Sequence, residues 1–254
     1  MKKTLLLTTI LTMISISSFA QKRAALVGLT KEATRIDYTG TDVRPVCYLV
    51  ESATYNDALM FNIYKAKIDS IMNVLGFVMI PQDSVLNTEL YKTKIKKALK
   101  KRRMTENKTP DIPAEGFAHF EKTTFNGLLE GTDFFVSPAN PEVYVVADYR
   151  TEINLQFILG IPVVNLGGDA CIRVFTDKKN IFDMWTTHTA KSYAVPFVKD
   201  VYSCWGYTIT EDIGVLQMEV IKATFSKLDE KIAKAEESVR KHYEKEAKKE
   251  SKKK

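Results

Sequence analysis

The spacing of hydrophobic positions changes character twice along the chain. Short apolar runs and helical spacing alternate over residues 43–136, strict alternation dominates from 143 to 190, and helical spacing returns near residue 210. A repeat of 3.6 indicates helix and a repeat of 2 indicates strand. The order predicts an α/β (α+β) fold, in which a βαβ unit leads into a mixed sheet with an antiparallel meander. Helices pack on this sheet, and a long helix closes the chain.

The first predicted unit begins at the apolar run Val46–Val50. Thr54 stands three residues before Asp57, as in a capping box, and a helix then runs to Gly76, which can take the left-handed conformation that ends helices. Phe77–Ile80 is the next apolar run. Strand, helix and strand in this order predict a right-handed parallel βαβ unit.

Further helices are expected between this unit and the meander. Asn87 can cap a second helix ending near Met104, a third covers about 117–131, and a short strand follows at 134–136.

The meander has expected strands at 143–158, 170–176 and 181–190. The glycine-containing stretch 160–169 lacks the G-x-G-x-x-G order, so it predicts a bulge and turn rather than a phosphate cradle. A heptad-like stripe then marks the closing helix, formed by Ile221, Phe225, Leu228, Ile232, Ala235 and Val239.

The first twenty residues have the three parts of a secretory signal peptide. A basic start precedes a short apolar run, and small residues at Ser18 and Ala20 favour a cut before Gln21. The alternative is an uncleaved anchor. Four segments follow from this interpretation: a signal peptide at 1–20, an N-terminal arm at 21–42 with a short strand near 24–27, a single domain at 43–228, and a lysine-rich helix or tail at 229–254. We expect an exported chain, periplasmic or secreted, without a transmembrane span after cleavage.

Three cysteines remain after the cut, so at most one internal disulfide can form. Buried thiols are the expected state, and if one disulfide forms, Cys171 with Cys204 is the expected pair. Cys204 also lies in a Ser-Cys-Trp string like that around the nucleophile of papain-like proteases, but the surrounding residues of that motif are missing. A cysteine-dependent hydrolase using Cys204 with His188 or His119 is therefore kept as an alternative function.

No other catalytic or metal-binding pattern is present in the sequence. The three histidines are far apart and no recurring ligand spacing occurs, so neither a metal nor a cofactor is expected. Asp148 and Glu152 can each be interpreted equally well as solvated side chains, so no acid–base pair is nominated.

The charge distribution separates two basic segments from an otherwise acidic chain. The composition, with 45% hydrophobic and 27% charged residues, excludes a disordered or polytopic membrane protein, and the net charge is +6. Residues 222–254 hold twelve basic and seven acidic side chains. The first basic segment holds eight basic residues and no acidic one: Lys92, Lys94, Lys96, Lys97, Lys100, Lys101, Arg102 and Arg103.

These segments predict docking on an anionic envelope surface or an envelope protein partner. Solvated helix faces are the alternative interpretation. Lysines dominate without interleaved aromatic residues, and the chain is expected to be exported, so nucleic acid is not an expected partner. A small-ligand-binding periplasmic domain is a further alternative, with a pocket lined by Phe157, Phe175, Trp185 and Tyr193.

Two short segments carry a resemblance to a known kind of domain. Gly131–Val136 gives a Gly-x-Asp step before a strand, and Arg173–Asp177 gives an apolar strand followed by a hairpin into Trp185. With the strands at 46–50 and 77–80, this order resembles the periplasmic α/β domain of the TolB N-terminal kind, shared by CsgG and LpoB. The resemblance implies a non-enzymatic role in envelope assembly, secretion or regulation through protein contact.

Overall fold

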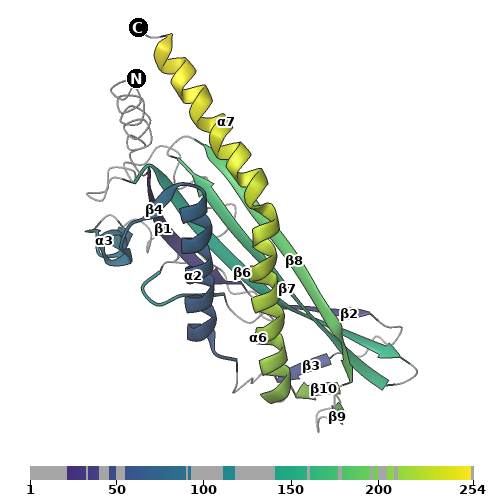
Figure 1. Cartoon of the computed structure of the whole chain (residues 1–254). Coiled ribbons are helices and arrows are strands. Elements are labelled where there is room, and N and C mark those ends of the chain that lie inside the picture. Colours follow the sequence, from purple (N-terminus) through teal and green to yellow (C-terminus); the bar gives the residue numbers. More distant parts are fainter. Residues whose placement is uncertain are drawn as a thin grey trace, which may run out of the picture.

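A mixed sheet forms the centre of the molecule. The computed structural model describes residues 22–32, 34–39, 46–49, 55–89, 91–92, 111–117, 141–158, 161–176, 179–194, 197–199, 205–208 and 211–252. The main sheet has seven strands in the order β4-β1-β6-β7-β8, with β2 (Arg35–Thr39) beside β6 and β5 (Ile112–Pro113) beside β1. Helices α2, α6 and α7 lie along one face of it (Figure 1). The predicted α+β class is confirmed.

The antiparallel meander is the largest part of the sheet. It consists of β6 (Val143–Ile158), β7 (Ile161–Phe175) and β8 (Asn180–Ala194). The predicted strands are confirmed, although β7 starts earlier than expected. The stretch 160–169 therefore lies mostly within a strand, and the irregularity predicted there appears as a register shift between Asn165 and Gly167 against β8.

Strand β1 (Lys22–Lys31) corrects the prediction of an N-terminal arm. It pairs in parallel with both β4 and β6, and every residue from Ala24 to Thr30 is buried. A strand covered on both faces carries an apolar run rather than an alternation. The stretch 22–31 is consequently an inner strand of the sheet and not a segment outside the domain.

The predicted βαβ unit is also corrected. Strand β3 (Val46–Leu49) belongs to a separate three-stranded sheet with β10 (Trp205–Thr208) and β9 (Phe197–Lys199). Strand β4 (Phe77–Met79) pairs instead with β1. The parallel crossover therefore runs from β1 through α2 to β4. The apolar runs at 46–49 and 77–79 look alike in sequence. Their spacing along the chain therefore does not show which other strand each of them pairs with.

Helix α2 (Asp57–Val74) has the predicted length and a different cap. Asn56 Oδ1 accepts a hydrogen bond from the Leu59 amide at 2.9 Å, and Gly76 follows the helix with φ of 82°, as expected. Thr54, the predicted capping residue, lies outside the described residues. Lys31 at the end of β1 binds Asp57 at 2.8 Å and so holds the start of the helix to the sheet.

The second predicted helix starts one residue later than expected. Asn87 ends the short helix α3 (Gln82–Leu86), and the Thr88 hydroxyl accepts from the Tyr91 amide at 3.2 Å. The remainder of this predicted helix, most of the third, and the strand at 134–136 lie outside the described residues.

The chain closes with α6 (Glu211–Ser226), the 3₁₀ turn η3 (Lys227–Lys231) and α7 (Ile232–Ser251), which together form one long rod across the sheet (Figure 1). The predicted stripe is confirmed, since its residues are buried or half-buried. An aromatic cluster joins α2, α6 and β6: the rings of Tyr64 and Phe225 stack with centroids 4.2 Å apart, and Tyr149 meets both edge-on. The Tyr64 hydroxyl donates to the Cys171 carbonyl at 2.9 Å.

Candidate ligand-binding cavity between α2 and α3

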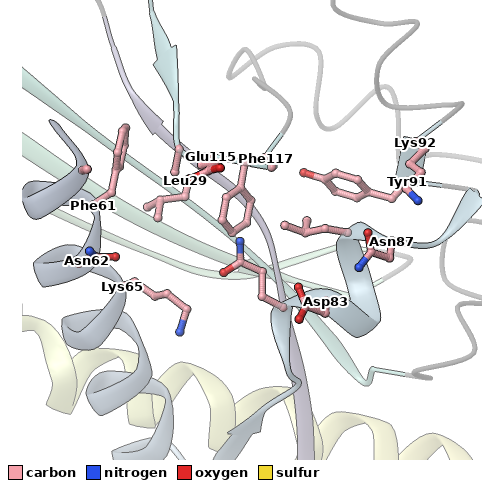
Figure 2. A pocket seen from close by; sticks show the side chains of 15 residues that line it. Leu29, Phe61, Asn62, Lys65, Asp83, Asn87, Tyr91, Lys92, Glu115 and Phe117 are labelled. Carbon is pink, nitrogen blue, oxygen red and sulfur yellow. The ribbon is translucent and has the colours of Figure 1, made fainter.

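A cavity of about 840 Å³ lies between α2 and α3 (Figure 2). Its walls come from one side of α2, from α3, from the start of the next helix at Tyr91 and Lys92, and from the turn at 114–117. Strand β1 contributes Leu29 to its base. Ligand pockets commonly measure some 300–1,000 Å³, so the volume suits a small molecule or a short peptide.

The apolar part of the cavity is rigid because the sheet and the aromatic cluster hold it. The Tyr91 hydroxyl donates to the Val27 carbonyl at 2.8 Å, which fixes its ring against β1. The ring of Phe61 meets the edge of Tyr149, with centroids 5.7 Å apart. Phe61, Tyr91 and Phe117 are each less than a tenth exposed. These rings supply a preformed apolar surface.

The turn at 114–117 places two side chains against the cavity. The Ala114 amide donates to the Leu29 carbonyl at 2.9 Å, and the Phe117 amide donates to the Ala114 carbonyl at 2.9 Å. Gly116 has φ of 79°, which L-residues rarely adopt. The turn therefore presents Glu115 and Phe117 to the cavity from a wall next to α3, where Gly116 lies close to Leu86.

Most polar side chains of the cavity have no side-chain partner among the described residues. Within the described part of the chain, no side-chain hydrogen bond or ion pair is recorded for the three carboxamides, the two carboxylates and the ammonium that line it: Asn62, Gln82, Asn87, Asp83, Glu115 and Lys92. Lys65 differs from these, because it binds Asp69 at 2.8 Å one helical turn away. The cavity thus combines an apolar base with polar groups that are free to bind a ligand.

Only one residue of the predicted basic surface is described. Lys92 is exposed and lies at the rim of the cavity. Lys94, Lys96, Lys97, Lys100, Lys101, Arg102 and Arg103 lie outside the described residues, so their surface stays a prediction.

The aromatic pocket predicted in the meander is a different place from this cavity. Phe175 is buried and Trp185 is 39% exposed, and neither lines the cavity. The side chains of Phe157 and Tyr193 lie outside the described residues. The aromatic residues that do line the cavity come from α2, the start of the next helix and the 114–117 turn.

The proposed cysteine chemistry stays a prediction. Cys171 is buried in β7, whereas Cys204 lies outside the described residues, so neither its disulfide nor its approach to a histidine is tested. His119 is also outside them. His188 lies opposite Gly168 on β8, where burial and the charge of Lys227 lower its pKa below the ordinary value.

Two arginines form ion pairs on the strands of the meander. Arg150 binds Asp169 and Glu152, and Arg173 binds Asp148 at 2.5 Å. Burial is the largest cause and would lower the pKa of Arg173, but Asp148, Cys171 and Asp183 together outweigh it and the pKa is raised. Asp148 is only 8% exposed, so its interpretation as a solvated side chain is wrong. In the described ranges, no group of three or more histidine, cysteine or acidic side chains is placed to hold a metal ion.

None of the described helices combines the length and the apolar character that a membrane crossing requires. The chain matches no family model and no curated protein. Among solved structures, it is similar to the hypothetical protein CT253 from Chlamydia trachomatis, with 11% identity, coverage of 87% of this chain and 98% of the other, and a TM-score of 0.33.

Proposed function

We propose that this protein is an exported, non-enzymatic binding protein of the cell envelope, and that it holds its ligand in the cavity between α2 and α3. The observation that carries the proposal is the set of polar side chains around an apolar base, most of which bind no other side chain in the part of the protein that the structure describes. Binding sites for small molecules typically combine an apolar lining with a few convergent polar groups.

The energetics of the lining support binding. A polar side chain that faces water in the empty cavity costs little, and a ligand can replace that water only if it offers matching donors and acceptors. Hydrogen bonds to charged groups such as Asp83 and Glu115 are stronger than those between neutral groups. The site therefore favours a polar ligand with an apolar part.

Export is supported by the pattern of the first twenty residues. The expected chain after cleavage begins at Gln21, one residue before β1. Expression in a bacterial host followed by mass spectrometry of the envelope fraction should give this N-terminus. An unprocessed chain in the cytoplasm would contradict the export part of the proposal.

Binding is tested by thermal unfolding of residues 21–254 with a panel of amino acids, short peptides, sugars, nucleotides and fatty acids. One class should raise the melting temperature. At a hundred times its Kd, a ligand stabilises by about 2.7 kcal/mol, or roughly 5–10 °C for a chain of this size.

A matched pair of variants locates the binding. Ala58 and Ala66 are both exposed alanines on α2, but only Ala58 lines the cavity. Ala58→Trp should fill the cavity and abolish the shift, whereas Ala66→Trp should retain it. The proposal is wrong if no compound in the panel stabilises the protein, or if Ala58→Trp leaves the shift intact.

The basic segment offers a second way to bind a partner. Lys92 at the cavity rim is its first residue, so an acidic partner at the segment would approach the cavity entrance. Replacing Lys96, Lys97, Lys100 and Lys101 by Glu should reduce association with envelope fractions in a sedimentation assay. Unchanged association would remove this role from the segment.

A further inference from the structure

We propose that the ligand of this cavity is a short peptide with free ends, whose ammonium binds at the acidic side chains Asp83 and Glu115 and whose carboxylate binds Lys92. This inference rests on the proposed function, since it names the class of ligand for the same site.

The signs and places of the charges support a ligand that carries both charges. In the view of Figure 2, Asp83 on α3 and Glu115 on the turn lie on opposite sides of the Phe117 ring, and Lys92 lies beyond Tyr91. The two carboxylates of the lining favour a cation in the cavity, because each lowers the energy of a positive charge close to it. Lys65 does not compete for the carboxylate end, since Asp69 already neutralises it.

The neutral groups of the cavity favour peptide bonds between those two ends. Asn62, Gln82 and Asn87 each offer an amide donor and a carbonyl acceptor, which is the pair that a peptide group needs. Sugars would also bind carboxamides, but they lack the charged ends. A single amino acid has both charges and no amide bond, and it would leave most of the cavity unfilled.

The apolar base of the cavity favours an apolar side chain in the peptide. Phe61 and Phe117 are buried rings whose faces border the cavity, so an apolar side chain in the middle of the peptide would leave water on contact with them. We therefore expect a tripeptide with an apolar or aromatic central residue to bind better than triglycine.

Calorimetric titration of the chain 21–254 with three forms of one peptide tests the inference. The probes are Ala-Phe-Ala with free ends, its N-acetyl form and its C-terminal amide. Blocking either end removes a charged hydrogen bond and should weaken binding roughly tenfold to a hundredfold. Equal affinity for the free and blocked forms would overturn the inference.

Variants of the cavity test which side chains bind each end of the peptide. Lys92→Gln should remove the preference for the free carboxylate over the amide and keep the preference for the free amine. The double variant Asp83→Asn with Glu115→Gln should do the opposite. Lys234→Gln and Glu230→Gln, which change exposed side chains far along the chain on α7 and η3, are the matched controls and should alter neither preference.

The two proposals can fail separately. If another class of compound stabilises the wild type and Ala58→Trp abolishes that effect, the cavity is a binding site and the peptide inference is wrong. If no compound binds there, both proposals are wrong.

Discussion

Gly168 leaves just enough room for α6 to lie on the sheet. A Cβ built on it would overlap Cδ1 of the fully buried Ile221, and it would lie 3.2 Å from the Arg150 carbonyl and 3.3 Å from Thr224 Oγ1. Helix α6 is also held to the sheet by Phe225, whose ring packs against Tyr149 of β6 with centroids 5.4 Å apart.

We predict that Gly168→Ala lowers the free energy of unfolding by about 1–3 kcal/mol, the usual cost of overpacking. Urea unfolding followed by circular dichroism measures it. Adding Ile221→Val removes the overlapping methyl group, so the double variant should be more stable than the sum of the two single changes predicts. Strict additivity would show that Ile221 is not the cause.

His242 makes the stability of the molecule depend on pH. It is 8% exposed on α7, its ring meets Tyr243 edge-on, and its Nδ1 has no hydrogen-bond partner among the described residues. Burial lowers its pKa below 6.5, and Lys179, Lys22 and Lys249 add to this, while Glu246 opposes it. The unfolded chain therefore binds this proton more readily than the folded one.

Because the folded-state pKa is the lower one, stability should be complete above about pH 6.5 and should fall as the pH drops below it. Melting temperatures from pH 7.5 to pH 5 measure the loss. His242→Phe keeps a ring and cannot titrate, so the loss should be smaller in this variant, with the remainder coming in part from His188, whose pKa is also lowered. An unchanged pH profile in the variant would contradict the assignment.

The sequence predicts the burial of some single residues and not of others. The stripe from Ile221 to Val239 was predictable because six apolar positions repeat at helical spacing. The burial of Asp148 was not, since its partner Arg173 is 25 residues away and meets it only through the register of β6 and β7.

Helix α7 packs on the sheet, although its composition is that of a solvent-exposed helix. Its sequence is rich in lysine and glutamate, yet Ala235, Val239 and His242 are buried where it packs on β8. Its start is also continuous with η3, whose Leu228 is fully buried. The segment predicted as a charged helix or tail is therefore part of the packed structure over much of its length.

A matched pair of alanines tests this packing. Ala235 is 2% exposed and Ala247 is exposed, and both lie on α7. Ala235→Glu should lower the free energy of unfolding by roughly 1–3 kcal/mol, because a carboxylate is buried without a partner. Trypsin should then cleave α7 faster at its lysines. Ala247→Glu should leave the melting temperature and the digestion pattern unchanged. Equal digestion of the two variants would show that α7 is not docked.

The cavity between α2 and α3 could not be predicted from the sequence, because the residues that line it come from separate segments of the chain. Asn62 and Lys65 lie on α2, Asp83 on α3 and Glu115 on a turn, and they meet only because all three segments rest on β1. On α2 alone, Asn62 and Lys65 are the ordinary polar side of an amphipathic helix. Only Lys92 stood out beforehand, and it did so because of its basic neighbours.

At the scale of the whole molecule, the main sheet depends on its first strand. The three strands of the meander were predictable from period two, apart from the early start of β7, whereas the place of β1 was not, because an apolar run carries no information about its neighbours. With β1 between β4 and β6, the residues once assigned to an arm are as central as the meander.

We predict that a chain starting at residue 43 does not fold. Removing β1 exposes the pairing edges of β4 and β6 and uncovers the core that Ala24–Leu29 fill. Heating this shortened chain should give no cooperative transition when it is followed by far-ultraviolet circular dichroism. A chain of residues 21–251 is the matched truncation and should melt like residues 21–254. A folded product from residues 43–254 would contradict the central place of β1.

The parallel ladder of β1 also sets the order in which the molecule can form. Lys22 meets Phe77, and Ala24 meets Val143, so the second ladder joins segments about 120 residues apart. Contacts at such separation close late and make folding slow, since the entropy of closing the loop is lost before the contacts form. More than half of the chain must therefore leave the ribosome before the sheet can close. A chain with that delay stays unfolded through much of its synthesis, so this topology is compatible with the export proposed above.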